Sequence, residues 1–148
     1  MRGVRWTMFD TNVYVAAIRE GLGGISFGRL ADAAPRTFLA SVVSAELRAG
    51  ALDETGRKIV IDLTQRFERL GRVVAPTSGS WNDAGDVLAN ITRREPRFRT
   101  KVRTLWNDVL IALSARQIGA TVVTENVDDF RLLRRYLRFD LEVAPGGR

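Results

Sequence analysis

The chain has 148 residues, 45% of them hydrophobic and 27% charged, which is the balance of one soluble globular domain. It contains no cysteine and no histidine, which excludes disulfides, the usual zinc sites, thiol nucleophiles and mechanisms that use imidazole. Its 23 lysines and arginines outnumber 17 aspartates and glutamates, giving a net charge of +6 that suits a nucleic acid or an acidic protein as partner. Hydrolytic chemistry in this chain would have to use carboxylates, with a metal ion to assist them.

The sequence predicts strands and helices in alternation. In chain order these are a strand at 6–9, a helix at 11–20, a strand at 37–41, helices at 43–48 and 53–70, a strand at 72–75, helices at 80–94 and 101–117, a strand at 121–124, a helix at 128–136 and a strand at 141–143. This alternation predicts an α/β fold, with three α/β/α layers and a mostly parallel central sheet of four to five strands.

Local signals set the ends of these elements. The glycine-rich segment 21–24 ends the first helix, and Asp53 is placed to cap the helix that follows it. Ser80 and Asp83 have the spacing of a capping box, and Gly119 follows the long helix as a stop signal. That long helix has apolar residues at i, i+3 and i+4 spacing. They are Val102, Leu105, Trp106, Val109, Leu110 and Leu113.

No apolar run approaches the ~18 residues that a membrane span requires. The first six residues have neither the long apolar stretch nor the small-residue cleavage site of an export signal. We therefore expect a cytoplasmic protein without a membrane partner. A single domain is expected over residues 1–144, followed by a flexible tail at 145–148.

Several acidic side chains should meet at one edge of the predicted sheet. Asp10 directly follows the first strand, Glu46 lies in the helix after the second, and Thr124 ends the fourth. The carboxyl ends of parallel strands share an edge, where α/β folds place their reactive groups. Asp108 should face the same edge, because it lies in the N-terminal half of its predicted helix.

Asp108 also stands out by its neighbours, since it follows Asn107 within an apolar segment. A carboxylate in such surroundings is costly unless it is paired or binds a cation. It could instead cap a local turn or pair with Arg103 or Arg116. Clustered carboxylates repel one another, and Mg²⁺ or Mn²⁺ relieves that repulsion because these ions prefer oxygen ligands. Such an ion can also activate a water for attack on a phosphodiester.

Four segments of the chain resemble the signature segments of PIN domains, and most closely those of the VapC family of toxins. They appear in the right order over nearly the whole chain, at residues 9–13, 44–47, 107–112 and 124–130. The resemblance implies a PIN-like fold and a metal-dependent endoribonuclease that uses Mg²⁺ or Mn²⁺. It also implies an RNA substrate, a homodimer and a cognate antitoxin, which together make the chain the toxin of a toxin–antitoxin pair.

The resemblance further implies roles for single residues. Asp10 and Asp108 would hold the metal, with Glu46 completing the acidic pocket. The fourth position falls on Asn126, an amide, so one tightly held metal is expected rather than two. Asp129 could contribute through a water or could cap the following helix. The supporting positions, which could instead serve only turn geometry, are Asn12, Asn107 and Thr124.

A basic stretch lies just upstream of Asp108. It is either a rim that grips RNA phosphates or a solvated connection between helices. Its members are Arg93, Arg94, Arg97, Arg99, Lys101 and Arg103. Trp81 and Trp106 are expected in core or dimer packing rather than as base-stacking platforms.

Three other functions are weaker fits to the residues. A phosphatase of the haloacid dehalogenase kind needs Asp-x-Asp after its first strand, whereas this chain has Asp10-Thr11-Asn12. A receiver domain needs a paired acid near its first strand and a lysine after its last, and neither is evident. A catalytically silent PIN-like module that binds RNA or protein is favoured only by Asn126.

Overall fold

The computed structural model describes residues 3–144, so the tail expected at 145–148 lies outside the described residues. Its strands are β1 (Thr7–Phe9), β2 (Leu39–Ala40), β3 (Val73–Val74), β4 (Thr121–Thr124) and β5 (Asp140–Val143). They pair in parallel as one sheet in the order β1-β4-β5 and as a second pair, β2-β3. A bridge between Thr7 and Thr37 links the two groups. The parallel α/β sheet expected from the sequence is confirmed.

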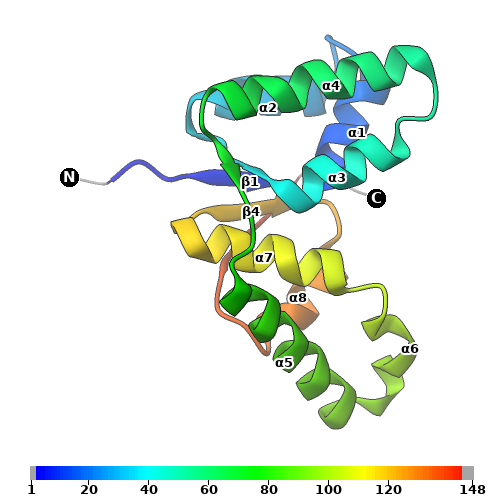
Figure 1. Ribbon diagram of the computed structural model, residues 1–148, viewed down its shortest axis with the longest axis vertical. Coiled ribbons are helices and arrows are strands. Elements are labelled where there is room, and N and C mark those ends of the chain that lie inside the picture. Colours follow the sequence, from blue (N-terminus) through cyan, green and yellow to red (C-terminus); the bar gives the residue numbers. More distant parts are fainter. Residues whose placement is uncertain (1–2, 145–148) are drawn as a thin grey trace.

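Helices cover both faces of these strands (Figure 1). They are α1 (Thr11–Glu20), α2 (Ile25–Ala33), α3 (Ser41–Gly50), α4 (Glu54–Arg69), α5 (Ser78–Arg94), α6 (Arg99–Val102), α7 (Trp106–Ile118) and α8 (Val127–Arg134), with single 3₁₀ turns at Ala34–Arg36 and Pro96–Phe98. Helices α1 to α4 lie on one side of the sheet and α5 to α8 on the other, which gives three α/β/α layers. In the described part of the chain, no helix is long and apolar enough to cross a bilayer.

The core is centred on β4 and α7. All four residues of β4 are buried, and α7 is buried continuously from Val109 to Ala115. This helix packs between β4 and α5, so it is covered on nearly every side and not only along the apolar stripe expected from the sequence. Trp106 is 41% exposed and Trp81 is 51% exposed, so the prediction of core packing is wrong for both. Their role in a dimer stays a prediction.

The helix predicted at 101–117 is instead two helices. Both the backbone N–H and the hydroxyl of Thr104 donate to the carbonyl of Lys101, at 2.8 and 2.7 Å, which tightens the chain into a turn after α6. Helix α7 then begins at Trp106, and Gly119 ends it with φ +67° as expected. The break matters because it moves Asp108 from the middle of a helix into the first turn of one.

One further prediction about helices is wrong, and one helix was not predicted. The capping box at Ser80 and Asp83 does not form, because α5 starts earlier and the Thr77 hydroxyl accepts from the backbone N–H of Ser80 at 3.1 Å. Helix α2 was not expected, because the glycines before it and Gly28 within it weaken its helical pattern. Asp53 does cap α4, accepting from the backbone N–H of Gly56.

Candidate active site

Asp10 lies where β1 turns into α1, as its sequence position predicts. Its backbone N–H donates to the carbonyl of Val123 at 2.9 Å and so continues the pairing of β1 with β4. One carboxylate oxygen accepts from the backbone N–H of Thr11, and the other accepts from the Thr124 hydroxyl, both at 2.8 Å. The side chain is only 5% exposed. Asp10 is therefore fixed in place by the first residue of α1 and the last residue of β4.

Glu46 approaches the same place from α3. Its Oε1 accepts from the hydroxyl of Thr11 at 2.8 Å, across 35 residues of sequence. Thr11 therefore contacts both carboxylates, with its backbone N–H on Asp10 and its hydroxyl on Glu46. This pair of hydrogen bonds holds two acidic side chains of different elements in fixed relation.

Asp108 is the third acid of the cluster and comes from the first turn of α7. Together with Asp10 and Glu46 it lines an open pocket of about 440 Å³. The other lining residues are Thr11, Asn12, Val15, Ala16, Arg19 and Glu125. Neither alternative partner pairs with Asp108 in the described part of the chain, since Arg116 pairs instead with Asp83 at 3.0 Å and Arg103 makes no ion pair.

The environment of Asp10 disfavours its charge. Burial raises the pKa of Asp10 from its ordinary 3.8 to about 6, and the negative charges of Glu46 and Asp129 add to this. The hydrogen bonds from Thr124 and Thr11 act in the opposite direction and lower the pKa, because they stabilise the ionised form. Desolvation is the larger effect.

The ionised form of Asp108 is disfavoured even more strongly than that of Asp10. Burial is again the largest cause, followed by the charges of Asp10, Asp129 and Glu46, and together they raise the pKa of Asp108 to about 8. The positive charge of Lys101 opposes this only in part. The positive charge near these carboxylates is therefore too small to offset their burial and mutual repulsion.

Thr124 links the acids to the amides of the site. Its hydroxyl donates to Asp10 and accepts from the backbone N–H of Asn126 at 2.9 Å. Asn12 is close by, with its side-chain amide 3.4 Å from the Thr124 hydroxyl and its oxygen 3.4 Å from the backbone N of Glu125. The structure therefore brings Asn12 and Thr124 to the site, whereas Asn107 is exposed and does not line the pocket.

The charge of Asp129 is neutralised by the protein itself. Asp129 Oδ1 lies 2.6 Å from Lys101 Nζ, and its Oδ2 accepts from the side-chain amide of Asn126 at 2.9 Å. Asp129 is close enough to raise the pKa values of Asp10 and Asp108, yet it does not line the pocket. Asn126 precedes α8 and holds the Asp129 carboxylate, so both residues sit at the margin of the cluster.

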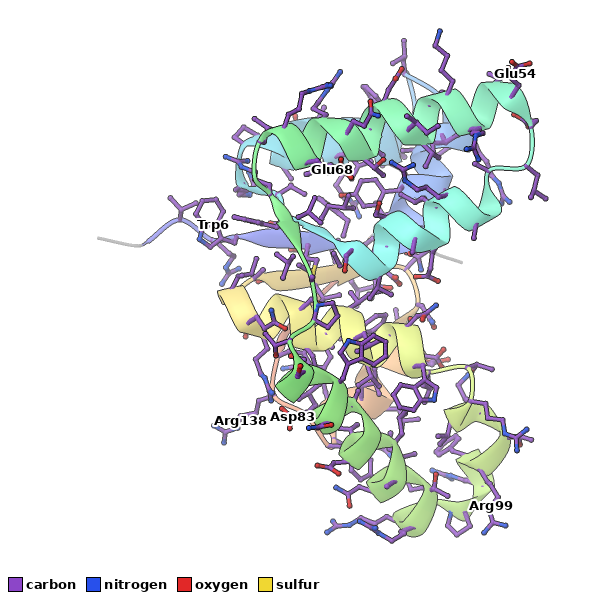
Figure 2. All side chains as sticks on the ribbon, in the orientation of Figure 1. Trp6, Glu54, Glu68, Asp83, Arg99 and Arg138 are labelled. Carbon is purple, nitrogen blue, oxygen red and sulfur yellow. The ribbon has the colours of Figure 1, made fainter. Side chains whose placement is uncertain are left out.

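The six residues of the predicted basic rim have different surroundings. Of its six residues only Lys101 contacts an acid of the cluster, while Arg97 pairs with Glu95 at 3.3 Å and none lines the pocket. Arg99 lies at the lower end of the molecule, away from the sheet (Figure 2). Whether any of the six residues contacts RNA stays a prediction.

Two charged residues of the pocket, Arg19 and Glu125, are not among the predicted site residues. Glu125 directly follows β4, and its sequence position does predict a place at the carboxyl edge of the sheet. Arg19 lies near the end of α1, two turns beyond Asn12 on the same face of the helix. Its presence in the pocket depends on the direction in which the pocket opens, which no motif encodes.

The sequence profile of the PIN domain matches residues 7–136, a span that includes Asp10, Glu46 and Asp108. The chain belongs to the PIN-domain family. No curated protein sequence matches it. The PIN-domain assignment agrees with the resemblance found in the four signature segments and with the observed parallel α/β/α architecture.

Solved structures with the same fold include three bacterial complexes. DNA-bound VapBC from Salmonella typhimurium aligns with a TM-score of 0.65 at 22% identity, covering 95% of this chain and 98% of that chain. VapBC2 from Rickettsia felis, bound to a promoter DNA fragment, gives 0.59 at 24% identity, with 93% and 98% covered. FitAcB from Neisseria gonorrhoeae gives 0.60 at 21% identity, with 91% and 95% covered. At these identities the similarity establishes the PIN fold.

Proposed function

We propose that this PIN domain is an endoribonuclease that depends on Mg²⁺ or Mn²⁺ and hydrolyses RNA phosphodiester bonds. The observation that carries the proposal is the convergence of Asp10, Glu46 and Asp108, from three distant parts of the chain, on one open pocket. The raised pKa values of Asp10 and Asp108 support it, because they mark a site that needs positive charge. The net charge of +6 suits a polyanionic substrate.

The donor set fits a hard divalent cation. Asp10 and Asp108 would hold it, with Glu46 completing the acidic wall, and all three offer only oxygen ligands. Within residues 3–144 no three acidic side chains lie close enough together to form a ready-made ligand cage. Mg²⁺ does not require such a cage, because it keeps several waters and is held by one or two carboxylates together with substrate phosphate. When bound, such an ion would lower the pKa of a coordinated water and would stabilise the negative charge on the phosphoryl group.

The chain's own groups keep the acids in position. Thr11 holds Asp10 and Glu46 together, and Thr124 fixes the second oxygen of Asp10. These hydrogen bonds favour the ionised form of Asp10, which is the form that binds a cation. Lys101 neutralises Asp129 at the margin of the site, so we propose one metal ion rather than two.

We further propose that the protein is the toxin of a toxin–antitoxin pair and acts as a homodimer with a cognate antitoxin partner. The resemblance to VapC toxins supports this, as does the shared fold with the VapBC and FitAcB complexes. Expression without a partner protein is expected to arrest bacterial growth. Harmless expression of active protein would count against the toxin role and leave the nuclease standing.

The test of the nuclease is cleavage of RNA by the purified protein. We expect cleavage with Mn²⁺ or Mg²⁺ and none with EDTA. The Asp108→Asn variant should cleave RNA at least ~100-fold more slowly than wild type. Mutation of residues that only support a metal ligand can already cost that much, and Asp108 is proposed to be a ligand itself. Asp62→Asn is the matched control, because Asp62 is an exposed residue of α4.

The alternatives give different results in the same assay. A silent PIN-like module, the reading that Asn126 favours, would bind RNA without cutting it under any metal condition. A small carboxylate-based phosphatase would release phosphate from a monoester and leave RNA intact. RNA cleavage by Asp108→Asn at the wild-type rate would refute the assignment of Asp108.

A further inference from the structure

One face of α1 runs along the floor of the pocket. Its lining residues are Asn12, Val15, Ala16 and Arg19, which follow the i, i+3, i+4 and i+7 spacing of a single helical face. The acids stand at the start of this face, and Arg19 stands at its end. Thr11 and Arg19 are eight residues apart, so the face extends ~12 Å along the helix axis at 1.5 Å per residue.

Arg19 differs from the other cation near the acids. Lys101 is held by Asp129 at 2.6 Å. Arg19 is exposed, and across residues 3–144 it takes part in no ion pair and no side-chain hydrogen bond, although it lines a pocket with four carboxylates. Its five N–H donors are therefore available to a ligand, and a guanidinium matches a phosphate in shape and charge.

We propose that Arg19 binds a backbone phosphate of the RNA strand next to the phosphate that is cut. The strand would then lie along α1, from the acidic end to Arg19, with the nonpolar side chains of Val15 and Ala16 beneath the intervening sugar. This inference rests on the proposed nuclease function and deepens it, because it places the substrate strand. Arg19 contacts the RNA and not the reacting atoms, so it is a substrate-binding residue.

A purely structural role for Arg19 makes a different prediction. Arg19 lies in the last turn of α1, where a positive charge favours the negative end of the helix dipole. If that were its only role, Arg19→Ala would lower the melting temperature and leave the binding of RNA unchanged. RNA binding therefore separates the two roles.

The experiment measures binding and cleavage of a short, single-stranded, random-sequence RNA pool. Binding is followed by fluorescence anisotropy in an Asp108→Asn background, which keeps the RNA intact, and cleavage is followed with otherwise unaltered protein and Mn²⁺. Arg19→Ala should weaken binding about tenfold and raise KM with little change in kcat, because a charge-assisted phosphate contact is lost. The slope of log affinity against log salt should fall by about 0.7, and Arg19→Lys should restore most of the affinity.

Arg69→Ala is the matched control. Arg69 is also an exposed arginine in the last turn of its helix, but it precedes β3 and therefore lies at the amino edge of the sheet, opposite the acids. It should leave binding and KM unchanged. A second measurement uses RNA with an uncharged methylphosphonate beside the cut site. On that RNA, wild type and Arg19→Ala should bind alike, because the partner charge is gone.

The outcomes separate this inference from the proposed function. Equal RNA binding by wild type and Arg19→Ala would overturn the inference, whether or not the protein cuts RNA. Weakened binding by Arg19→Ala in a protein that never cuts RNA would uphold the contact of Arg19 with RNA phosphate and overturn the nuclease. Absence of RNA binding by every variant would overturn both.

Discussion

Asp108→Asn should stabilise the protein at neutral pH when no divalent ion is present. Asp108 lies largely buried beside two other acids of the pocket, and this raises its pKa from 3.8 to about 8. The ionised form is therefore much less favourable in the folded protein than in the unfolded chain. Asparagine has nearly the shape of a protonated aspartate and carries no charge, so it removes this penalty.

The direction in which stability changes with pH follows from the raised pKa of Asp108. Between pH ~4 and ~8 the folded state keeps the Asp108 proton that the unfolded chain has released, so stability falls as the pH rises through this range. At pH 7 the shift corresponds to at most ~4 kcal/mol, since one pKa unit is worth ~1.4 kcal/mol. Because Asp108 keeps partial contact with water, screening reduces the expected gain in free energy of unfolding to ~1–2 kcal/mol.

The assay is thermal unfolding of wild type and Asp108→Asn in EDTA at several pH values. A gain of 1–2 kcal/mol corresponds to a rise in Tm of ~3–6 °C for a chain of this size. The difference between the two proteins should be absent near pH 4, should grow as the pH rises, and should level off only above pH ~8. Asp62→Asn, in the exposed face of α4, controls for the loss of a carboxylate as such. A less stable Asp108→Asn protein at pH 7, or a difference that does not vary with pH, would refute the reasoning.

Adding Mn²⁺ should reverse the order of stability. A ligand that binds only the folded state stabilises it by mass action, and at one hundred times its Kd the gain is ~2.7 kcal/mol. Wild type should show this gain, whereas Asp108→Asn should show much less of it. Equal stabilisation of both proteins by Mn²⁺ would mean that Asp108 does not hold the metal.

Three other substitutions test separate features of the site and core. Thr124→Val should lower the free energy of unfolding by ~1–2 kcal/mol and weaken Mn²⁺ binding in calorimetry, since Asp10 and the Asn126 N–H both lose a partner; Thr121→Val, at the other end of β4, is the control and should not weaken Mn²⁺ binding. Lys101→Ala should tighten Mn²⁺ binding by ~0.5–1 kcal/mol, because it removes a positive charge from the margin of the acidic cluster; weaker binding would contradict this. Tyr14→Phe should leave stability unchanged or raise it by ~1 kcal/mol in denaturant unfolding, because within the described part of the chain the buried Tyr14 hydroxyl has no hydrogen-bond partner; a large loss would reveal a partner.

The placement of the three acids followed from a rule about sheets. In a parallel sheet the segments after each strand share one edge, so Asp10 and Glu46 could be brought together from strand positions alone. That prediction survives errors of one or two residues in the strand ends, such as β2 being two residues long instead of five. The roles of these residues as metal ligands remain predictions that the proposed experiments test.

The failures in the sequence reasoning share a cause, which is that they depend on individual side-chain contacts that composition and periodicity do not encode. A run of basic residues before Asp108 predicts a positive surface, but only the three-dimensional path of the chain decides that Lys101 reaches Asp129 while Arg99 points away. The division of the predicted helix into α6 and α7 depends on the Thr104 hydroxyl bonding to the Lys101 carbonyl. Thr, Ser and Asn side chains compete with helical hydrogen bonds in this way. The periodicity of apolar residues gives no information about that competition.

Asp108 shows how competing effects decide the character of this pocket. Its place in the first turn of α7 favours a negative charge there, because helix N-termini carry partial positive charge worth ~0.3–1 kcal/mol. Burial and three neighbouring carboxylates act against that charge, and they raise the pKa despite the helix. The unfavourable effects are therefore the larger ones, and the fold alone does not compensate for them. A divalent ion adds the missing positive charge directly, which is why removing the charge of Asp108 and adding Mn²⁺ should both stabilise the protein but should not do so additively.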